Sequence, residues 1–253
     1  MAPLTTHLVI GERVFAHLPH LGPGDYGAFL LGCVLVDVHV FSDIARRATH
    51  FAERLVGEGA HAFHQSCANF LGQRDALLRR PWHELTRAER AFVAGYLCHL
   101  AADEEWKQFD WLVLQSKGIY WWTDLPVPGS VIVTVFDVLS KELFLDYAAV
   151  SSALGDVAVP DTFTHVPLEL FQATWKIARV YVLGSSTLES FLELLGRLGK
   201  TDAEIEAERR QHQRYWQDAA DLIHAGFGGV PTRVEAMVQR ALDMMPRLWA
   251  SLT

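Results

Sequence analysis

One stretch of the chain decides its fold class: Phe92-Val-Ala-Gly-Tyr-Leu-Cys-His99-Leu-Ala-Ala-Asp103-Glu-Glu-Trp106. It is apolar over most of its length and belongs to a longer helical pattern from Arg87 to Gln115. His99 and Asp103 are four residues apart, so a helix stacks the imidazole and the carboxylate on one face. The stretch therefore predicts a largely apolar helix that carries an ionisable pair.

Helical periodicity continues on both sides of this stretch. It predicts further helices at residues 4–16, 26–40, 42–56, 61–78, 131–150, 168–198, 203–225 and 232–252. Two helix starts carry the capping-box pattern, Thr86 with Glu89 and Thr201 with Glu204. We expect an all-α fold, a bundle of many helices.

The length of 253 residues is compatible with one large domain or two small ones. We find no internal repeat of fixed period, which argues against solenoids and propellers. We expect a single all-α domain over residues 1–253. Residues 122–130, with Pro126, Pro128 and Gly129, are the best loop or linker and would separate the N-terminal half from a C-terminal helical half.

The composition excludes several classes of protein. With 50% hydrophobic residues the chain is not disordered, and a net charge of −8 opposes nonspecific binding to nucleic acid or to anionic membranes. No apolar stretch reaches the roughly 18 residues of a transmembrane helix. Glu12 and Arg13 interrupt any export signal, and Cys33, Cys67 and Cys98 are an odd number without CxxC pairs. We expect a cytoplasmic protein with buried free thiols.

Ionisable residues inside apolar segments are the informative feature, because an unpartnered buried carboxylate is costly. Asp37 ends an apolar stretch and either points into the protein or caps a turn with Ser42 or Asp43. His50 and His7 are flanked by apolar neighbours, and each alone is more often a core or surface histidine than a ligand. Together with His99 and Asp103 they form a set of three histidines and two aspartates, which suits Zn²⁺ and also Fe or Mn.

The order of these motifs resembles the bacterial zinc-dependent phospholipase C family. The resemblance covers about the first 110 residues and rests on Thr6-His7, Gly27-Ala-Phe-Leu-Leu-Gly32 leading to Asp37, Thr49-His50-Phe51, and the stretch from Phe92 to Asp103. That family is all-helical and shares its fold with single-strand-specific zinc nucleases. The resemblance therefore implies the same fold for this chain.

The resemblance also implies roles for individual residues. Asp37, His50, His99 and Asp103 correspond to one zinc site of the family. His7 corresponds to the histidine of a neighbouring site, which shares the carboxylate matching Asp103. The residue matching Asp37 is also the family's leading candidate for the general base or the group that orients water.

This chain departs from the family pattern after Asp103. Family members place a histidine shortly after the HxxxD helix and then an HxxxE pair that completes another zinc site, whereas no histidine lies here between Asp103 and His165. We therefore expect one or two ions. Possible substitute ligands are Glu104, Glu105, Asp110, His39, His61 and His64.

A bound Zn²⁺ would lower the pKa of a coordinated water and polarise a phosphoryl oxygen. We expect a metal-dependent hydrolase that acts on a small phosphoester or phospholipid, with no nucleic-acid partner. Tyr120, Trp121 and Trp122 either wall a substrate pocket or pack at the edge of the core. The pairs Arg46-Arg47 and Arg79-Arg80 either assist capture of the phosphate or are solvated helix faces.

Two rival hypotheses remain open at this level. The chain could be a helical protein that retains part of a metal site without catalysis and serves binding or assembly. It could also be an ordinary helical interaction domain in which the histidines and aspartates pair within the core. Elemental analysis separates the second rival from the metal-binding alternatives.

Overall fold

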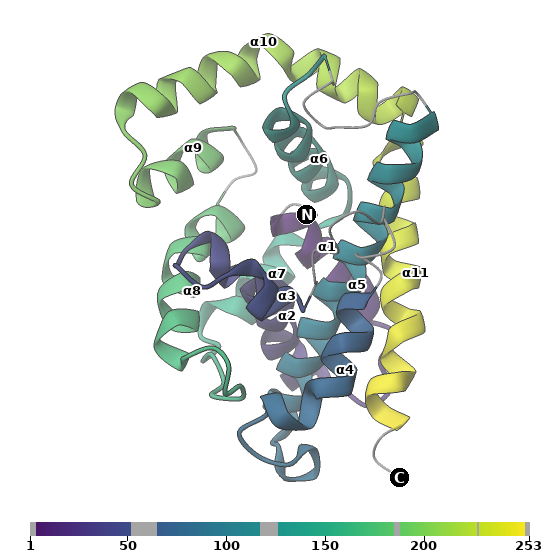
Figure 1. Cartoon of the computed structure of the whole chain (residues 1–253). Coiled ribbons are helices and arrows are strands. Elements are labelled where there is room, and N and C mark those ends of the chain that lie inside the picture. Colours follow the sequence, from purple (N-terminus) through teal and green to yellow (C-terminus); the bar gives the residue numbers. More distant parts are fainter. Residues whose placement is uncertain (1–3, 52–64, 117–125, 185–187, 227, 251–253) are drawn as a thin grey trace.

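The computed structural model describes residues 4–51, 65–116, 126–184, 188–226 and 228–250 (Figure 1). Within these ranges the chain forms helices and no strand, so the predicted all-α fold is confirmed. The α-helices are α1 Leu4–Phe15, α2 Tyr26–Leu35, α3 Arg46–His50, α4 Ser66–Leu77, α5 Arg87–Ser116, α6 Gly129–Phe144, α7 Tyr147–Gly155, α8 Leu168–Leu183, α9 Leu188–Arg197, α10 Asp202–Gly226 and α11 Gly229–Ala250. Short 3₁₀ helices are η1 Pro23–Asp25, η2 Val36–Val40 and η4 Trp82–Glu84.

The centre of the fold is the contact between α2 and α5. Every residue of α2 from Gly27 to Leu35 is buried, as expected of a helix that is apolar on all sides. The two helix backbones approach closely because glycines lie at the crossing. A Cβ on Gly32 would lie 2.1 Å from the carbonyl oxygen of Phe92, and a Cβ on Gly95 would lie 1.9 Å from that of Phe29. No side chain larger than hydrogen fits at either position.

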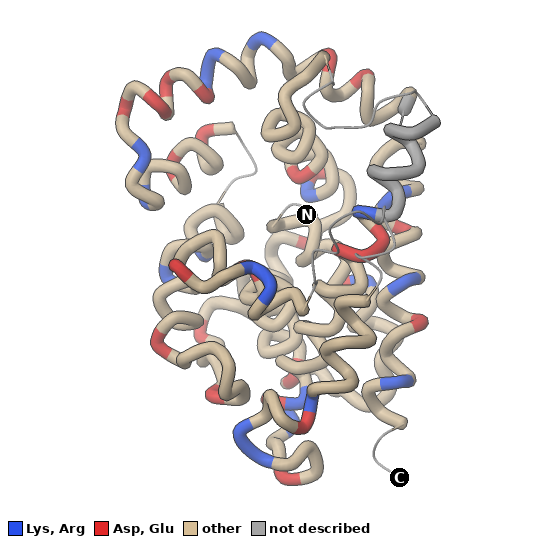
Figure 2. Tube along the Cα trace, in the orientation of Figure 1, with Lys and Arg blue, Asp and Glu red and all other residues tan. Residues whose placement is uncertain are grey.

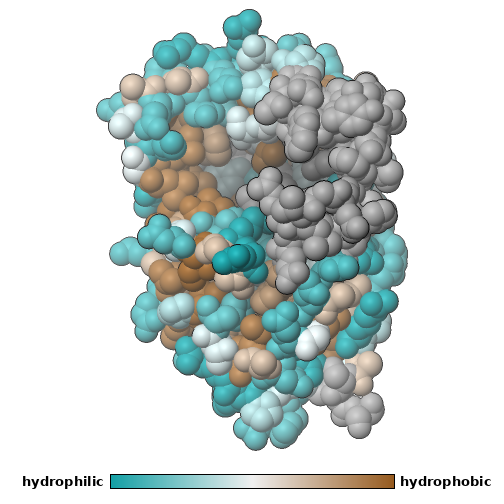
Figure 3. All heavy atoms as spheres, viewed as in Figure 1, coloured by the Kyte–Doolittle hydropathy of each residue, from teal (hydrophilic) through white to brown (hydrophobic). Residues whose placement is uncertain are grey.

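The other helices enclose this pair. In Figure 1 the long helices α5 and α11 run side by side, and they are in contact, while α1 packs against α2 and α6. The helix α10 crosses one end of the molecule and contacts α6 and α9. Charged residues recur along α10 in Figure 2, and in Figure 3 hydrophilic residues cover that end while apolar residues gather where Figure 1 draws α8 and α9.

The helix predicted over residues 26–40 changes type over its last five residues. The α-helix ends at Leu35 and continues as the 3₁₀ helix η2, in which Asp37 has a non-helical ψ of 19°. Aspartate disfavours helix interiors because its side chain competes for backbone groups. The turn is held by Ser42, whose hydroxyl donates to the carbonyl of Val38 (2.8 Å). Asp37 is therefore released from the helix and is buried, with 3% of its surface exposed.

Three other predicted helices are shorter or divided. Of the helix predicted over 42–56, the structure shows α3, which ends at His50 where Phe51 adopts a left-handed conformation (φ 53°), and residues 52–56 lie outside the described residues. The one predicted over 131–150 is broken at Leu145, after which Asp146 caps α7 by accepting from the amide of Ala149. The one predicted over 168–198 is broken at the extended Gly184. Short local breaks of this kind carry no clear signal in hydrophobic periodicity.

Several smaller expectations are confirmed. The carboxylates of Glu89 and Glu204 each accept from the backbone amide and the hydroxyl of the capping threonine three residues before them. All three cysteines are buried and unpaired. A membrane-spanning helix is absent from the described part of the chain. Of the linker predicted at 122–130, residues 122–125 lie outside the described ranges and α6 begins at Gly129, so the division into halves stays a prediction.

Candidate metal centre

Four of the predicted ligands meet where η2, α3 and α5 converge. The Nε2 atom of His50 lies 3.2 Å from Asp37 Oδ1, 3.3 Å from His99 Nε2 and 3.5 Å from Asp103 Oδ2. His99 Nε2 lies 3.8 Å from Asp37 Oδ1. Tetrahedral Zn²⁺ with nitrogen and oxygen ligands at about 2.0–2.1 Å requires ligand atoms about 3.3 Å apart. The four distances, from 3.2 to 3.8 Å, are close to this value, and His50, His99 and Asp103 form one group that could hold an ion.

The hydrogen bonds behind the histidines determine which nitrogen faces this centre. His99 Nδ1 lies 2.7 Å from the carbonyl oxygen of Cys33, which can only accept, so Nδ1 carries the proton. His50 Nδ1 lies 2.9 Å from the hydroxyl of Thr49, whose own proton goes to the carbonyl of Arg46. His50 Nδ1 is therefore also a donor. Both Nε2 atoms are left with a lone pair directed into the centre, which is the tautomer that metal-ligating histidines use.

This arrangement suits a bound cation better than it suits direct hydrogen bonds between the side chains. Two Nε2 lone pairs face each other across 3.3 Å, which is unfavourable unless a proton or a cation lies between them. Burial lowers the pKa of both His50 and His99 to about 3, so a proton is disfavoured. Asp37 Oδ1 is buried and accepts no hydrogen bond among the described residues. A divalent ion would satisfy all three groups.

The two carboxylates differ in their surroundings. Burial raises the pKa of Asp37, and the nearby Asp103 charge raises it further. Burial also raises the pKa of Asp103, but surrounding positive charge outweighs it and holds the pKa well below its usual range. Asp103 is therefore the more readily ionised of the two, and a bound cation would ionise both.

His7 joins the centre from α1. Its ring stacks on that of His99, with centroids 3.6 Å apart and planes 13° apart. Its Nε2 lies 3.7 Å from Asp103 Oδ1, which is the oxygen that does not face His50. Asp103 therefore presents one carboxylate oxygen to His7 and the other to His50.

Asp137 on α6 holds α1 in the position that delivers His7. Its buried carboxylate accepts from the amide of Thr6 (2.7 Å), from the hydroxyl of Thr6 (3.0 Å), from the amide of Thr5 (3.3 Å) and from the hydroxyl of Tyr181. It thus caps the first turn of α1 from another helix, where a negative charge is favourable. The sequence analysis missed this residue because its partners on α1 are more than 130 positions away.

Two further side chains reach the centre: His39, which the sequence analysis named as a possible substitute ligand, and Arg46, which it named for capture of the phosphate or as a solvated helix face. His39 Nδ1 lies 3.7 Å from Asp37 Oδ1, because the turn of η2 brings both residues to the same side. Burial lowers the pKa of His39 to about 4. Arg46, at the start of α3, donates from Nη2 to Asp103 Oδ2 (2.5 Å). Its position four residues before His50 is the signal that could have linked it to the predicted ligands, since a helix places both on one face.

The remaining candidates do not join the described centre. Glu104 accepts from the amide of Cys67 and from Arg240 instead, and Glu105 lies 3.8 Å from Arg233. The side chain of Asp110 is not described, and His61, His64 and the aromatic run 120–122 lie outside the described residues.

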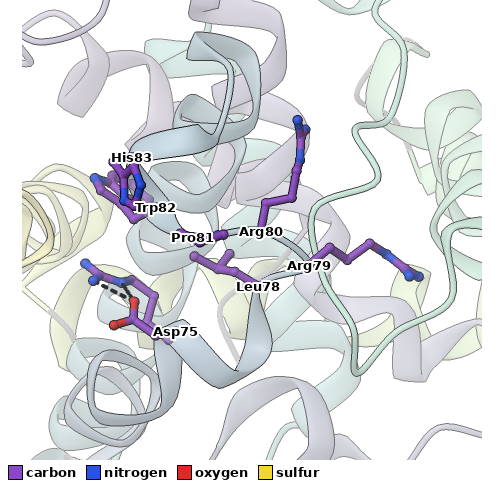
Figure 4. A pocket seen from close by; sticks show the side chains of 8 residues that line it. Asp75, Leu78, Arg79, Arg80, Pro81, Trp82 and His83 are labelled. Atoms are coloured by element: carbon purple, nitrogen blue, oxygen red, sulfur yellow. Dashed lines mark hydrogen bonds and ion pairs between the residues drawn. The ribbon is translucent and has the colours of Figure 1, made fainter.

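A separate surface pocket of about 560 Å³ lies around η4 and the end of α4, and it contains none of the predicted ligands (Figure 4). Three arginines line it, but each is paired with a carboxylate: Arg74 with Asp75, Arg79 with Asp161 and Arg80 with Glu89. Its charge is therefore already compensated within the protein.

Comparison with known proteins bears on the same part of the chain. Searches with the whole chain find no match among curated proteins and no match among solved structures. Residues 6–104 match the family model described as zinc dependent phospholipase C, and this segment contains all five predicted ligands. The resemblance seen in the first 110 residues is thereby confirmed, and the segment that carries the candidate metal centre matches the zinc-dependent phospholipase C family.

Proposed function

We propose that this protein is a metal-dependent hydrolase of phosphoesters, similar to phospholipase C, that uses zinc. The observation that carries the proposal is that His50 Nε2 lies 3.2 Å from Asp37 Oδ1, 3.3 Å from His99 Nε2 and 3.5 Å from Asp103 Oδ2. The family match over residues 6–104 supports zinc as the metal. We infer a small phosphoester or a phospholipid as the substrate and the cytoplasm as the location.

In this proposal, His50, His99 and Asp103 hold one ion, and Asp37 completes the shell or orients water. His7 and Asp103 Oδ1 would hold a second ion if one binds. Zn²⁺, when bound, supplies Lewis acidity that polarises a phosphoryl oxygen and lowers the pKa of water. Fe or Mn would suit the same donors.

The chain itself supplies orientation and exclusion of water. The bond from His99 to the Cys33 carbonyl and the bond between His50 and Thr49 hold the two imidazoles in one tautomer and one orientation. The hydroxyl of Tyr96 donates to the carbonyl of Thr49 and thereby anchors the end of α3, which carries His50. All five predicted ligands are at most 3% exposed, so the centre is shielded from bulk water.

The test combines metal content with hydrolysis. Purified wild-type protein, His99→Ala and His83→Ala are compared by elemental analysis and by hydrolysis of a chromogenic phosphodiester and a chromogenic monoester. His83 lies on η4 with its side chain 77% exposed, so it is a matched histidine control. We expect stoichiometric zinc and activity in wild type and His83→Ala, and loss of both in His99→Ala. Hydrolysis that His99→Ala leaves unchanged would contradict the proposal.

The alternative function is a helical protein that binds metal for assembly or recognition without catalysis. The absence of a histidine between Asp103 and His165 favours it, because the family's HxxxE pair has no counterpart there. Stoichiometric zinc without hydrolysis of either chromogenic ester would support this alternative.

A further inference from the structure

The metal centre is closed on most sides, and Arg46 marks the side where it reaches solvent. The side chains of His7, His50, His99, Asp37 and Asp103 are between 0% and 5% exposed. The Arg46 side chain is 29% exposed although it touches Asp103 directly. It is the guanidinium that joins the centre to the surface within the described part of the chain. A ligand that enters from solvent on this side would meet Arg46 next to the metal ligands.

Most of the hydrogen-bonding capacity of Arg46 is not used by the described residues. A guanidinium has five N–H donors arranged as a planar fork. Nη2 donates to Asp103 Oδ2, whereas Nε and Nη1 make no hydrogen bond with the described residues. The fork geometry matches two oxygens of one phosphate group. Arg46 therefore has donors to offer an anion while it keeps its bond to Asp103.

The charge of the chain leaves attraction of an anion to local cations. The net charge of −8 gives no long-range attraction for an anionic substrate. Asp37 and Asp103 together neutralise one divalent ion.

We propose that Arg46 recognises the phosphoryl group of the substrate and holds its anionic oxygens beside the metal centre. This inference rests on the proposed hydrolase function and deepens it, because it assigns the substrate-binding cation. It also commits the substrate to an ester that retains at least one ionised phosphoryl oxygen.

The competing explanation is that Arg46 only orients Asp103. The neighbour Arg47 provides a matched control, since it is exposed and has no ion pair with the described residues. The experiment uses the full zinc-loaded chain as wild type, Arg46→Met, Arg46→Lys and Arg47→Met. Inorganic phosphate is the probe, its binding is measured by isothermal titration, and the zinc content of each sample is measured by elemental analysis.

We expect Arg46→Met to weaken phosphate binding by about 10- to 100-fold with unchanged zinc content, which is the effect of losing charge-assisted hydrogen bonds. Arg46→Lys keeps the charge but not the fork, so its phosphate affinity should be intermediate. Arg47→Met should bind phosphate like wild type. With the chromogenic diester, kcat/KM of Arg46→Met should fall by a similar factor.

Two results would overturn the inference while leaving the proposed function intact. One is equal phosphate affinity in Arg46→Met and Arg47→Met, with wild-type zinc and hydrolysis. The other is loss of zinc from Arg46→Met that Arg46→Lys restores, which would make Arg46 a positioning residue for Asp103. Absence of zinc from wild-type protein would instead overturn the proposed function, and the inference with it.

Discussion

Replacing Gly95 by alanine should separate the two helices that build the metal centre. The added Cβ would lie 1.9 Å from the carbonyl oxygen of Phe29, 2.9 Å from its carbonyl carbon and 3.0 Å from the amide nitrogen of Cys33. These are backbone atoms, so no rotamer change relieves the contact. A Cβ and a carbonyl oxygen need about 3.2 Å, so α2 and α5 must move apart by roughly 1.3 Å at the crossing.

The displacement falls directly on the metal ligands. His99 lies one turn after Gly95 and is oriented by the carbonyl of Cys33 at 2.7 Å. A shift of roughly 1.3 Å would lengthen that contact to about 4 Å, beyond hydrogen-bonding distance. We expect overpacking to cost about 1–3 kcal/mol of unfolding free energy. Loss of the bond that orients His99 should lower zinc affinity by about 10- to 100-fold.

The assay compares Gly95→Ala with Gly72→Ala. Gly72 lies in α4, and a Cβ there would meet nothing within 4 Å, so this variant should be slightly more stable, by about 0.5–1 kcal/mol. Thermal unfolding gives the stability of each variant, and competition with a chromogenic chelator gives its zinc affinity. If Gly95→Ala retains both the wild-type melting temperature and the zinc affinity of Gly72→Ala, the close helix contact does not control the centre.

Three other predictions address the centre from different directions. Asp137→Asn should lower the unfolding free energy by about 2–3 kcal/mol and reduce occupancy of an ion held by His7, because an amide cannot accept all the bonds that cap α1. The control Asp146→Asn, at the exposed start of α7, should leave metal content unchanged in elemental analysis. Chelator treatment should lower the melting temperature of wild-type protein, because zinc bound at 100 times its Kd adds about 2.7 kcal/mol, and a melting curve indifferent to chelator would refute a bound ion. In metal-free protein the folded state keeps His50 and His99 neutral down to about pH 3, while the unfolded chain protonates them near pH 6.5. The unfolding free energy should therefore fall by about 1.4 kcal/mol per pH unit for each histidine as the pH drops below 6.5. Urea titrations at pH 7, 6 and 5 test this, and a constant unfolding free energy would show that the two rings are not buried as described.

Local spacing explains why part of the centre was accessible to sequence reasoning. His99 and Asp103 share one helix, and a separation of four residues determines that they share a face. The apolar neighbours of Asp37, His50 and His7 likewise indicated burial, and all three are at most 3% exposed. That these residues are metal ligands stays a prediction.

The turn at Asp37 could not be predicted from local spacing. Periodicity predicted one continuous helix over residues 26–40, which would have placed Asp37 and His39 on different sides. The 3₁₀ turn of η2 instead brings both toward His50, and it depends on the bond from Ser42 to Val38. A hydrogen bond from a side chain to the backbone favours the turn over a continued helix. The free-energy difference between the two is small, and the pattern of hydrophobic residues does not reveal it.

The amino-acid sequence by itself determined the helical class, the types of donor and their burial, because these depend on composition and on spacing within one element. Only the tertiary structure decided that Asp37, His50 and His99 lie within 4 Å of one another, that Asp137 anchors α1 and that Arg46 joins Asp103. The physical reason is that distances between helices are determined by how closely their backbones pack. Here that distance depends on the two glycines at the α2–α5 crossing, whose contacts exist only once the helices have met.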